Sequence, residues 1–219
     1  MFFFYLNNIL NFRMILFYIL LVTIFVLWIL KHEKQLRSTY MKKESLPLVD
    51  IKDMAIYTGL SLISKGYKAT PLKLQKILYY EQAWFMVFFG RENTLFTDIP
   101  QAWVNGPVYP TIYHEYKDMT EGMCDKLSIS DFGYEDAIDG MAKIYTKLNL
   151  TDEQLKCIDS VITMYGAKTQ NQLIMMTHCE DPWCEKRENI APFLRSTEEL
   201  SLDTMYSYYK KRYDNNRKL

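Results

Sequence analysis

The chain has 219 residues, 49% of them hydrophobic, and its 26 basic residues balance its 26 acidic residues. This length and composition suit one folded domain with an appendage and exclude a disordered chain. Residues 1–40 hold four basic residues and one acidic residue, so the remainder of the chain is mildly acidic. That charge argues against nucleic acid as the main ligand.

The first 40 residues form an apolar N-terminal segment. Residues 14–30 are an uninterrupted apolar run, which as a helix would span about 25 Å, slightly less than a hydrocarbon core of about 30 Å. Two interpretations remain open: a transmembrane helix at 14–30, or an over-long gene model that includes translated upstream DNA before a natural start at Met41. The basic residues after the run place the body in the cytoplasm, anchored to the inner face of the membrane if the run is a real anchor.

Residues 41–219 are expected to form a compact helical domain, and its first two helices carry clear boundary signals. Asp50 is suited to cap an apolar-periodic stretch that stops at Gly66. Thr70 then supplies a capping hydroxyl, and Pro71 is suited to the first position of the next helix.

This second helix ends at Gly90 and is predicted to be amphipathic. An apolar stripe at helical spacing is expected to be buried: Leu74, Ile77, Leu78, Trp84, Phe85 and Phe88. The opposite positions are expected to face solvent: Lys73, Gln75, Lys76, Tyr79 and Gln82.

The sequence QAWVNGPVYP at 101–110 interrupts the helical pattern. Ala-Trp-Val predicts a short strand at best and Asn-Gly-Pro is typical of a turn, so we expect one short extended insertion around residues 95–110. Pro110 then begins a short helix that runs through Tyr116. Residues 120–135 are rich in Gly, Asp and Ser and predict a loop.

Three more helices follow in the remaining sequence. Thr151 and Gln154 form a capping box, and Pro182 prevents a helix from continuing across the segment around it. The predicted helices cover residues 152–165, 169–178 and 202–213. The fold class is therefore mainly α, a compact helical domain with one short extended insertion, preceded by an apolar N-terminal helix.

Residues suited to catalysis or to metal binding are few. His114 and Asp118 approach the HExxH zinc pattern, but the aspartate stands where the second histidine is required. His178, Cys179 and Cys184 lie close in sequence without the second ligand pair of a zinc finger. No glycine-rich phosphate loop is present, and the four cysteines suit reduced thiols. We expect no catalytic residue, no cofactor, no metal and no disulfide.

Aromatic side chains with polar tips are unusually numerous. Such rings either cover the edge of a core or supply contact area and a polar handle at an interface, and composition leaves both interpretations open. The rings in question are Tyr79, Tyr80, Trp84, Trp103, Tyr109, Tyr113, Tyr116 and Trp183.

Three segments together resemble the Panacea domain, the SocA-like antitoxin domain that also occurs in phage-associated proteins. They are TPLKLQKILYYEQAW at 70–84, AWVNGPVYPTIYHEY at 102–116 and THCEDPWCEKR at 177–187. The resemblance covers approximately residues 50–195, and its third segment departs in detail from the family pattern.

The resemblance implies an antitoxin that is not an enzyme. Such a protein neutralises a toxin encoded by a neighbouring gene through direct, stoichiometric protein–protein binding, so the expected partner is a cognate protein toxin. We predict that polar-tipped side chains contact this partner: Gln75, Tyr79, Gln82, Tyr109 and Trp183.

Two other functions remain as alternatives. One is a regulatory or adaptor protein of a phage or mobile element, without a toxin partner. The other is a hydrolase built on His178. A toxic open reading frame beside the gene favours the antitoxin.

Overall fold

The computed structural model describes residues 48–217. The apolar segment 1–40, with its run at 14–30, lies outside the described residues, as does the predicted N-terminal helix. Among the residues that are described, no helix has both the length and the hydropathy that a membrane span requires.

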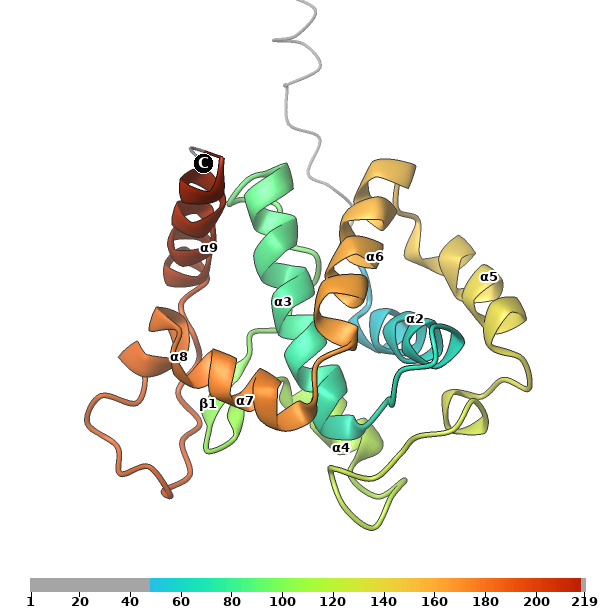
Figure 1. The fold of residues 1–219 in the computed structure, drawn as a ribbon, viewed down its shortest axis with the longest axis horizontal. Helices are drawn as coiled ribbons and strands as arrows, with labels where there is room; N and C mark the ends of the chain where they lie inside the picture. Colours follow the sequence, from blue (N-terminus) through green and yellow to red (C-terminus); the bar gives the residue numbers. More distant parts are fainter. Residues whose placement is uncertain (1–47, 218–219) are drawn as a thin grey trace, which may run out of the picture. The chain divides into compact units, whose positions relative to one another are not determined.

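The described part of the chain is mainly helical, with one small antiparallel hairpin (Figure 1), which confirms the predicted fold class for the domain. The helices are α2 (Ile51–Ser64), α3 (Pro71–Phe89), α4 (Pro110–Tyr116), α5 (Ala137–Leu148), α6 (Asp152–Gly166), α7 (Gln170–His178), α8 (Asp181–Glu185) and α9 (Leu202–Asn216). The hairpin strands are β1 (Gln101–Trp103) and β2 (Gly106–Val108), and a 3-10 turn spans Ser130–Phe132.

Most of the predicted helix boundaries are confirmed by hydrogen bonds at the caps. The Asp50 carboxylate accepts from the Lys52 amide at 2.7 Å, and the Thr70 hydroxyl accepts from the Lys73 amide at 3.1 Å. The capping box at Thr151 is formed, and an equivalent box starts α7 at Thr169. These bonds satisfy amides that have no partner within their own helix, so the starts of these four helices are defined by local sequence.

Two helices were not predicted. Helix α5 follows residues 120–135, which form a loop as expected apart from the 3-10 turn, and Asp136 caps it through the amides of Ile138 and Asp139. Helix α8 contains Pro182 in its first turn, where a missing N–H group costs no helical hydrogen bond. The proline therefore starts a short helix here instead of only ending the preceding one.

Helix α3 lies between α9 and α6 (Figure 1), and it also packs against α2, α4, α7 and the hairpin. As a result every residue from Pro71 to Ala83 is buried, with no solvent-facing side over this stretch. The expected two-sided amphipathic helix is therefore wrong. Phe88, assigned to the buried stripe, is 52% exposed, because the last turn is covered only in part, by Tyr213 of α9 among others.

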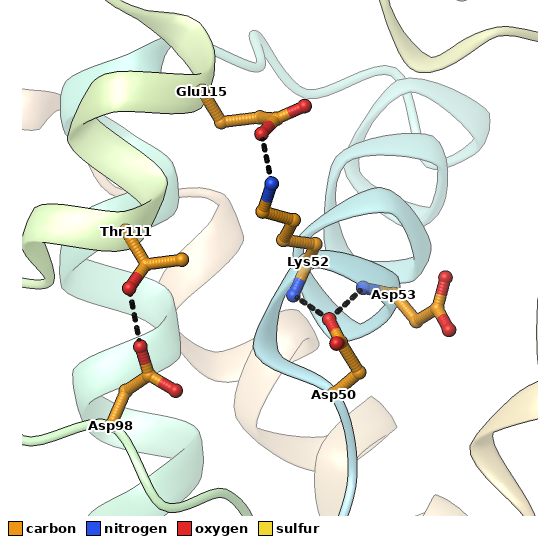
Figure 2. Close-up of polar contacts among 6 residues, drawn as sticks. All are labelled: Asp50, Lys52, Asp53, Asp98, Thr111 and Glu115. Carbon is orange, nitrogen blue, oxygen red and sulfur yellow. Dashed lines mark hydrogen bonds and ion pairs between the residues drawn. The ribbon is translucent and has the colours of Figure 1, made fainter.

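Polar contacts position α4 beside the start of α2 (Figure 2). The Lys52 ammonium lies 2.6 Å from the Glu115 carboxylate and joins the two helices. The Thr111 hydroxyl donates to Asp98, in the segment before the hairpin, at 2.6 Å. Because exposed ion pairs contribute little free energy, these contacts mainly fix the direction in which α4 leaves the hairpin.

Candidate partner-binding site

Two glutamines of α3 hold the extended insertion against the helix. The Gln75 amide accepts from the Tyr109 backbone N–H at 2.7 Å and donates to the Tyr109 carbonyl oxygen at 3.4 Å. One amide thus satisfies both backbone groups of Tyr109, as a neighbouring strand would. Nearer the C-terminal end of α3, the Gln82 amide accepts from the Leu95 backbone N–H at 2.8 Å and donates to the Phe96 carbonyl oxygen at 3.2 Å. The two side chains clamp both ends of the insertion.

Lys76 lies between them and is fully buried. Its Nζ donates to the Pro107 carbonyl oxygen in β2 at 2.8 Å. Burial lowers the pKa of Lys76 to about 7. Gly106 lies beside it with φ +92°, and a Cβ there would lie 2.5 Å from the Thr177 hydroxyl and 3.1 Å from Lys76 Nζ. The turn therefore requires glycine for both its backbone conformation and its packing.

The third family-like segment bonds to strand β1 of the hairpin. Trp183 Nε1 donates to the Trp103 carbonyl at 2.9 Å, and Arg187 Nη1 donates to the Ala102 carbonyl at 2.8 Å. Arg187 Nη2 reaches three carbonyl oxygens of the following loop, those of Ala191, Pro192 and Leu194. One guanidinium thereby fixes both β1 and the loop that follows α8.

Glu180 connects this segment to the core on the other side of α3. Tyr80 donates to one carboxylate oxygen at 3.2 Å, and Tyr209 of α9 donates to the other at 2.6 Å. Burial raises the pKa of Glu180, and these hydrogen bonds oppose that rise. Tyr80 also stacks on Tyr165 with ring centroids 3.8 Å apart, so the cluster ties α3, α6, α8 and α9 together.

A pocket of about 440 Å³ opens where α3, the hairpin, α4 and the loop after α8 meet. Its walls are largely apolar and its polar lining residues carry no carboxylate. The lining residues are Leu72, Gln75, Lys76, Trp103, Val104, Asn105, Val108, Tyr113, His114, Met123, Arg195, Ser196 and Thr197. Concave, mostly apolar sites with a few polar groups are the usual form of binding sites.

The structure corrects the predicted exposure of the partner-binding residues. Tyr79, Gln82 and Tyr109 are fully buried and Gln75 is 1% exposed, because neighbouring elements cover the side of α3 that the sequence pattern assigned to solvent. Trp183 is half-buried, with its Nε1 bonded to the hairpin.

Of the five predicted residues, Gln75 alone lines the pocket, and its amide is already engaged by Tyr109. The pocket residues that the sequence pattern missed include Arg195 and Thr197, which are exposed. They carry no motif, and reach the pocket because Arg187 holds the loop that precedes them. Only the basic and polar character of this loop could have suggested them.

Cysteines and histidines give no coordination site in the part of the chain that is described, where no three His, Cys, Asp or Glu side chains form a group suited to a metal. All four cysteines are free thiols. Cys184 Sγ donates to the His178 carbonyl at 3.1 Å, and the His178 ring stacks on Trp183 at 4.0 Å. Burial lowers the pKa of His178. These contacts shape the junction between α7 and α8.

The comparison with protein families gives one match. The model of the antitoxin SocA-like Panacea domain matches residues 74–184, which is just over half of the chain and runs from α3 to α8. The chain therefore belongs to this family, and the resemblance drawn from the three segments is confirmed over a narrower range than 50–195. Membership indicates an antitoxin role. No significant match is found among curated proteins or among solved structures.

Proposed function

From this family membership, we propose that the protein is the antitoxin of a toxin–antitoxin pair. It neutralises a toxin encoded by a neighbouring gene through direct and stoichiometric binding. The observation that supports the proposal most is the family match over residues 74–184. The matched range includes most of α3, the hairpin and α4, which contribute most of the residues that line the pocket.

Stoichiometric binding agrees with the use of polar side chains in the matched range. Gln75, Lys76 and Gln82 bond to backbone groups of the extended insertion, and Glu180 bonds to tyrosines. Side chains that hold the domain together are suited to presenting a surface. The partner is then expected on the outside of this unit, at the pocket.

The test is a growth assay in cells that carry the neighbouring open reading frames, each expressed alone and with this protein. We expect one frame to arrest growth alone and to be tolerated when the protein is present. Titration of the two purified proteins should show rescue of the toxin's target near equimolar amounts. Full protection at a small fraction of that amount, with chemically altered toxin, would indicate an enzyme instead.

The alternative is a regulatory or adaptor protein of a phage or mobile element. It would be favoured if no neighbouring frame is toxic and the genes around it encode phage structural proteins. The family match then describes shared ancestry without neutralisation.

We also propose that residues 41–219 are sufficient for neutralisation, because the whole family match lies within them. A chain that starts at Met41 should fold and should protect cells as well as the full chain. Loss of protection in a truncated chain with an unchanged melting temperature would assign a function to residues 1–40.

A further inference from the structure

The pocket combines apolar walls with an unbalanced positive charge. Among its lining residues, the Trp103 and Tyr113 rings contact each other with centroids 4.8 Å apart, and the Leu72 N–H donates to the Met123 carbonyl oxygen at 2.9 Å. The basic lining residues are Arg195 at the exposed side, Lys76 at the buried side, and His114. None of the thirteen lining residues is acidic.

Lys76 is the least satisfied charge in this arrangement. An ammonium group has three donor positions, and within residues 48–217 the Nζ atom has one hydrogen-bond acceptor, the Pro107 carbonyl, and no ion pair. A buried cation without a counter-charge is costly, and its pKa falls accordingly to about 7. A carboxylate in the pocket would remove that cost, so the free protein favours an anionic occupant.

Resting on the proposed function, we propose that this pocket receives an acidic side chain of the toxin. An Asp or Glu carboxylate of a toxin segment is placed toward Arg195 and Lys76, and an adjacent apolar side chain packs against Trp103 and Tyr113. The charge of the lining residues selects the acid, because no carboxylate of the pocket competes for the cations. The aromatic wall selects a polypeptide over a small free carboxylate, because it provides contact area that an isolated carboxylate would not use.

The first experiment needs no toxin and uses two short peptides, acetyl-Leu-Asp-Phe-amide and acetyl-Leu-Asn-Phe-amide. NMR titration of the full chain should show shifts at Trp103 and Tyr113 with the aspartate peptide. The asparagine peptide should bind about tenfold more weakly, since it lacks the charge-assisted hydrogen bond. Equal binding of the two peptides, or shifts located elsewhere, would overturn the proposal.

A matched pair of variants assigns the charge to the pocket. In R195Q the preference for the aspartate peptide should fall several-fold, whereas K211Q, an exposed lysine on α9, should keep it. An unchanged preference in R195Q contradicts the placement. Sodium acetate at the same concentration is the competitor: displacement of the peptide by acetate alone would mean a small-carboxylate site and would overturn the choice of a protein segment.

The second experiment uses the toxin identified by the growth assay. R195E should weaken toxin binding at least about tenfold with an unchanged melting temperature, and K211E should not. If wild-type protein protects cells and R195E binds equally well, the pocket assignment fails while the antitoxin function stands. If no neighbouring frame is toxic, the antitoxin function fails, and the peptide experiment still decides the chemistry of the pocket.

Discussion

Helices α3 and α5 show two ways in which a helix is incorporated into this domain. Helix α5 buries one stripe, Ala137, Gly140, Ile144 and Leu148, against α2 and leaves its charges in water. Helix α3 is buried on all sides over thirteen consecutive residues, several of them polar or charged. In α5 the polar residues are a solvated face, whereas in α3 they are partners for backbone groups of other segments.

The difference teaches that a polar residue opposite an apolar stripe has two possible surroundings. In α5 water satisfies it, and a change there costs little. In α3 it satisfies a buried N–H or carbonyl group, and a change leaves that group without a partner. Substitutions on the two helices should therefore have very different effects, and four of them test the comparison in order of expected size.

The largest effect is expected for Tyr79→Ala. Tyr79 is fully buried, with ring contacts to Tyr80 at 5.2 Å and Tyr209 at 6.1 Å, so truncation leaves a large cavity at the centre of the domain. We expect a loss of about 3–5 kcal/mol in the free energy of unfolding, measured by urea denaturation. Phe88→Ala on the same helix is the control, and should cost less than half as much because Phe88 is 52% exposed. Equal losses would mean that α3 is not buried as described.

Next in size is Gln82→Ala. The change leaves Leu95 N and the Phe96 carbonyl without their bonds to the amide, and each unsatisfied buried group costs about 1–3 kcal/mol. We expect a destabilisation of about 2–4 kcal/mol, together with faster amide hydrogen exchange at Leu95. Asn171→Ala at an exposed position of α7 serves as the control and should be nearly neutral. A neutral Gln82→Ala would restore the interpretation of Gln82 as a surface residue.

The third effect depends on pH and concerns Glu81. Burial raises the pKa of the Glu81 carboxyl group from its ordinary 4.5 to about 8, and the hydrogen bond from the Thr58 hydroxyl opposes this rise. Between pH 4.5 and 8 the folded protein therefore holds a proton that the unfolded chain has lost. The contribution of Glu81 to stability is complete below the lower value and declines as the pH rises toward the higher one.

In Glu81→Gln this decline is removed, since the amide does not titrate. The free energy of unfolding of the wild type minus that of the variant should fall by up to about 1.4 kcal/mol between pH 6 and pH 7, inside this window. Taking the difference cancels the other titrating groups, including Lys76, whose lowered pKa acts in the opposite direction. A difference that is constant from pH 5 to pH 8 would show that Glu81 is ionised in the folded protein.

The smallest effect is expected on α5, for Ile138→Ala. Ile138 is 72% exposed, and alanine has the higher helix propensity, so the free energy of unfolding should change by no more than about 0.5 kcal/mol in either direction. Thermal denaturation of the wild type and of the Ile138→Ala variant measures this change. A loss as large as that of Gln82→Ala would mean that this face of α5 is covered and that the comparison with α3 is wrong.

Much of the fold could be predicted from the sequence because helix starts are local. The side chains of Asp50, Thr70, Thr151 and Thr169 bond to amides two or three residues ahead, so a short window of sequence contains both partners. The positive φ of Gly106 is also a local property, because the sequence Asn-Gly-Pro is typical of a turn. The Asp136 cap of α5 and the spacing of its buried residues are equally local signals, so this helix too could be predicted from its own sequence.

The surroundings of the polar residues on α3 were decided only by the tertiary structure. Gln75 bonds 34 residues ahead and Tyr80 bonds 100 residues ahead, to segments whose positions depend on the packing of the whole domain. Helical periodicity gives the direction in which a side chain leaves the helix axis. It gives no information about which element of the fold lies in that direction. The pocket arises for the same reason: Lys76 and Arg195 are far apart in sequence, and the Arg187 guanidinium, by holding the loop that follows α8, brings them to one site.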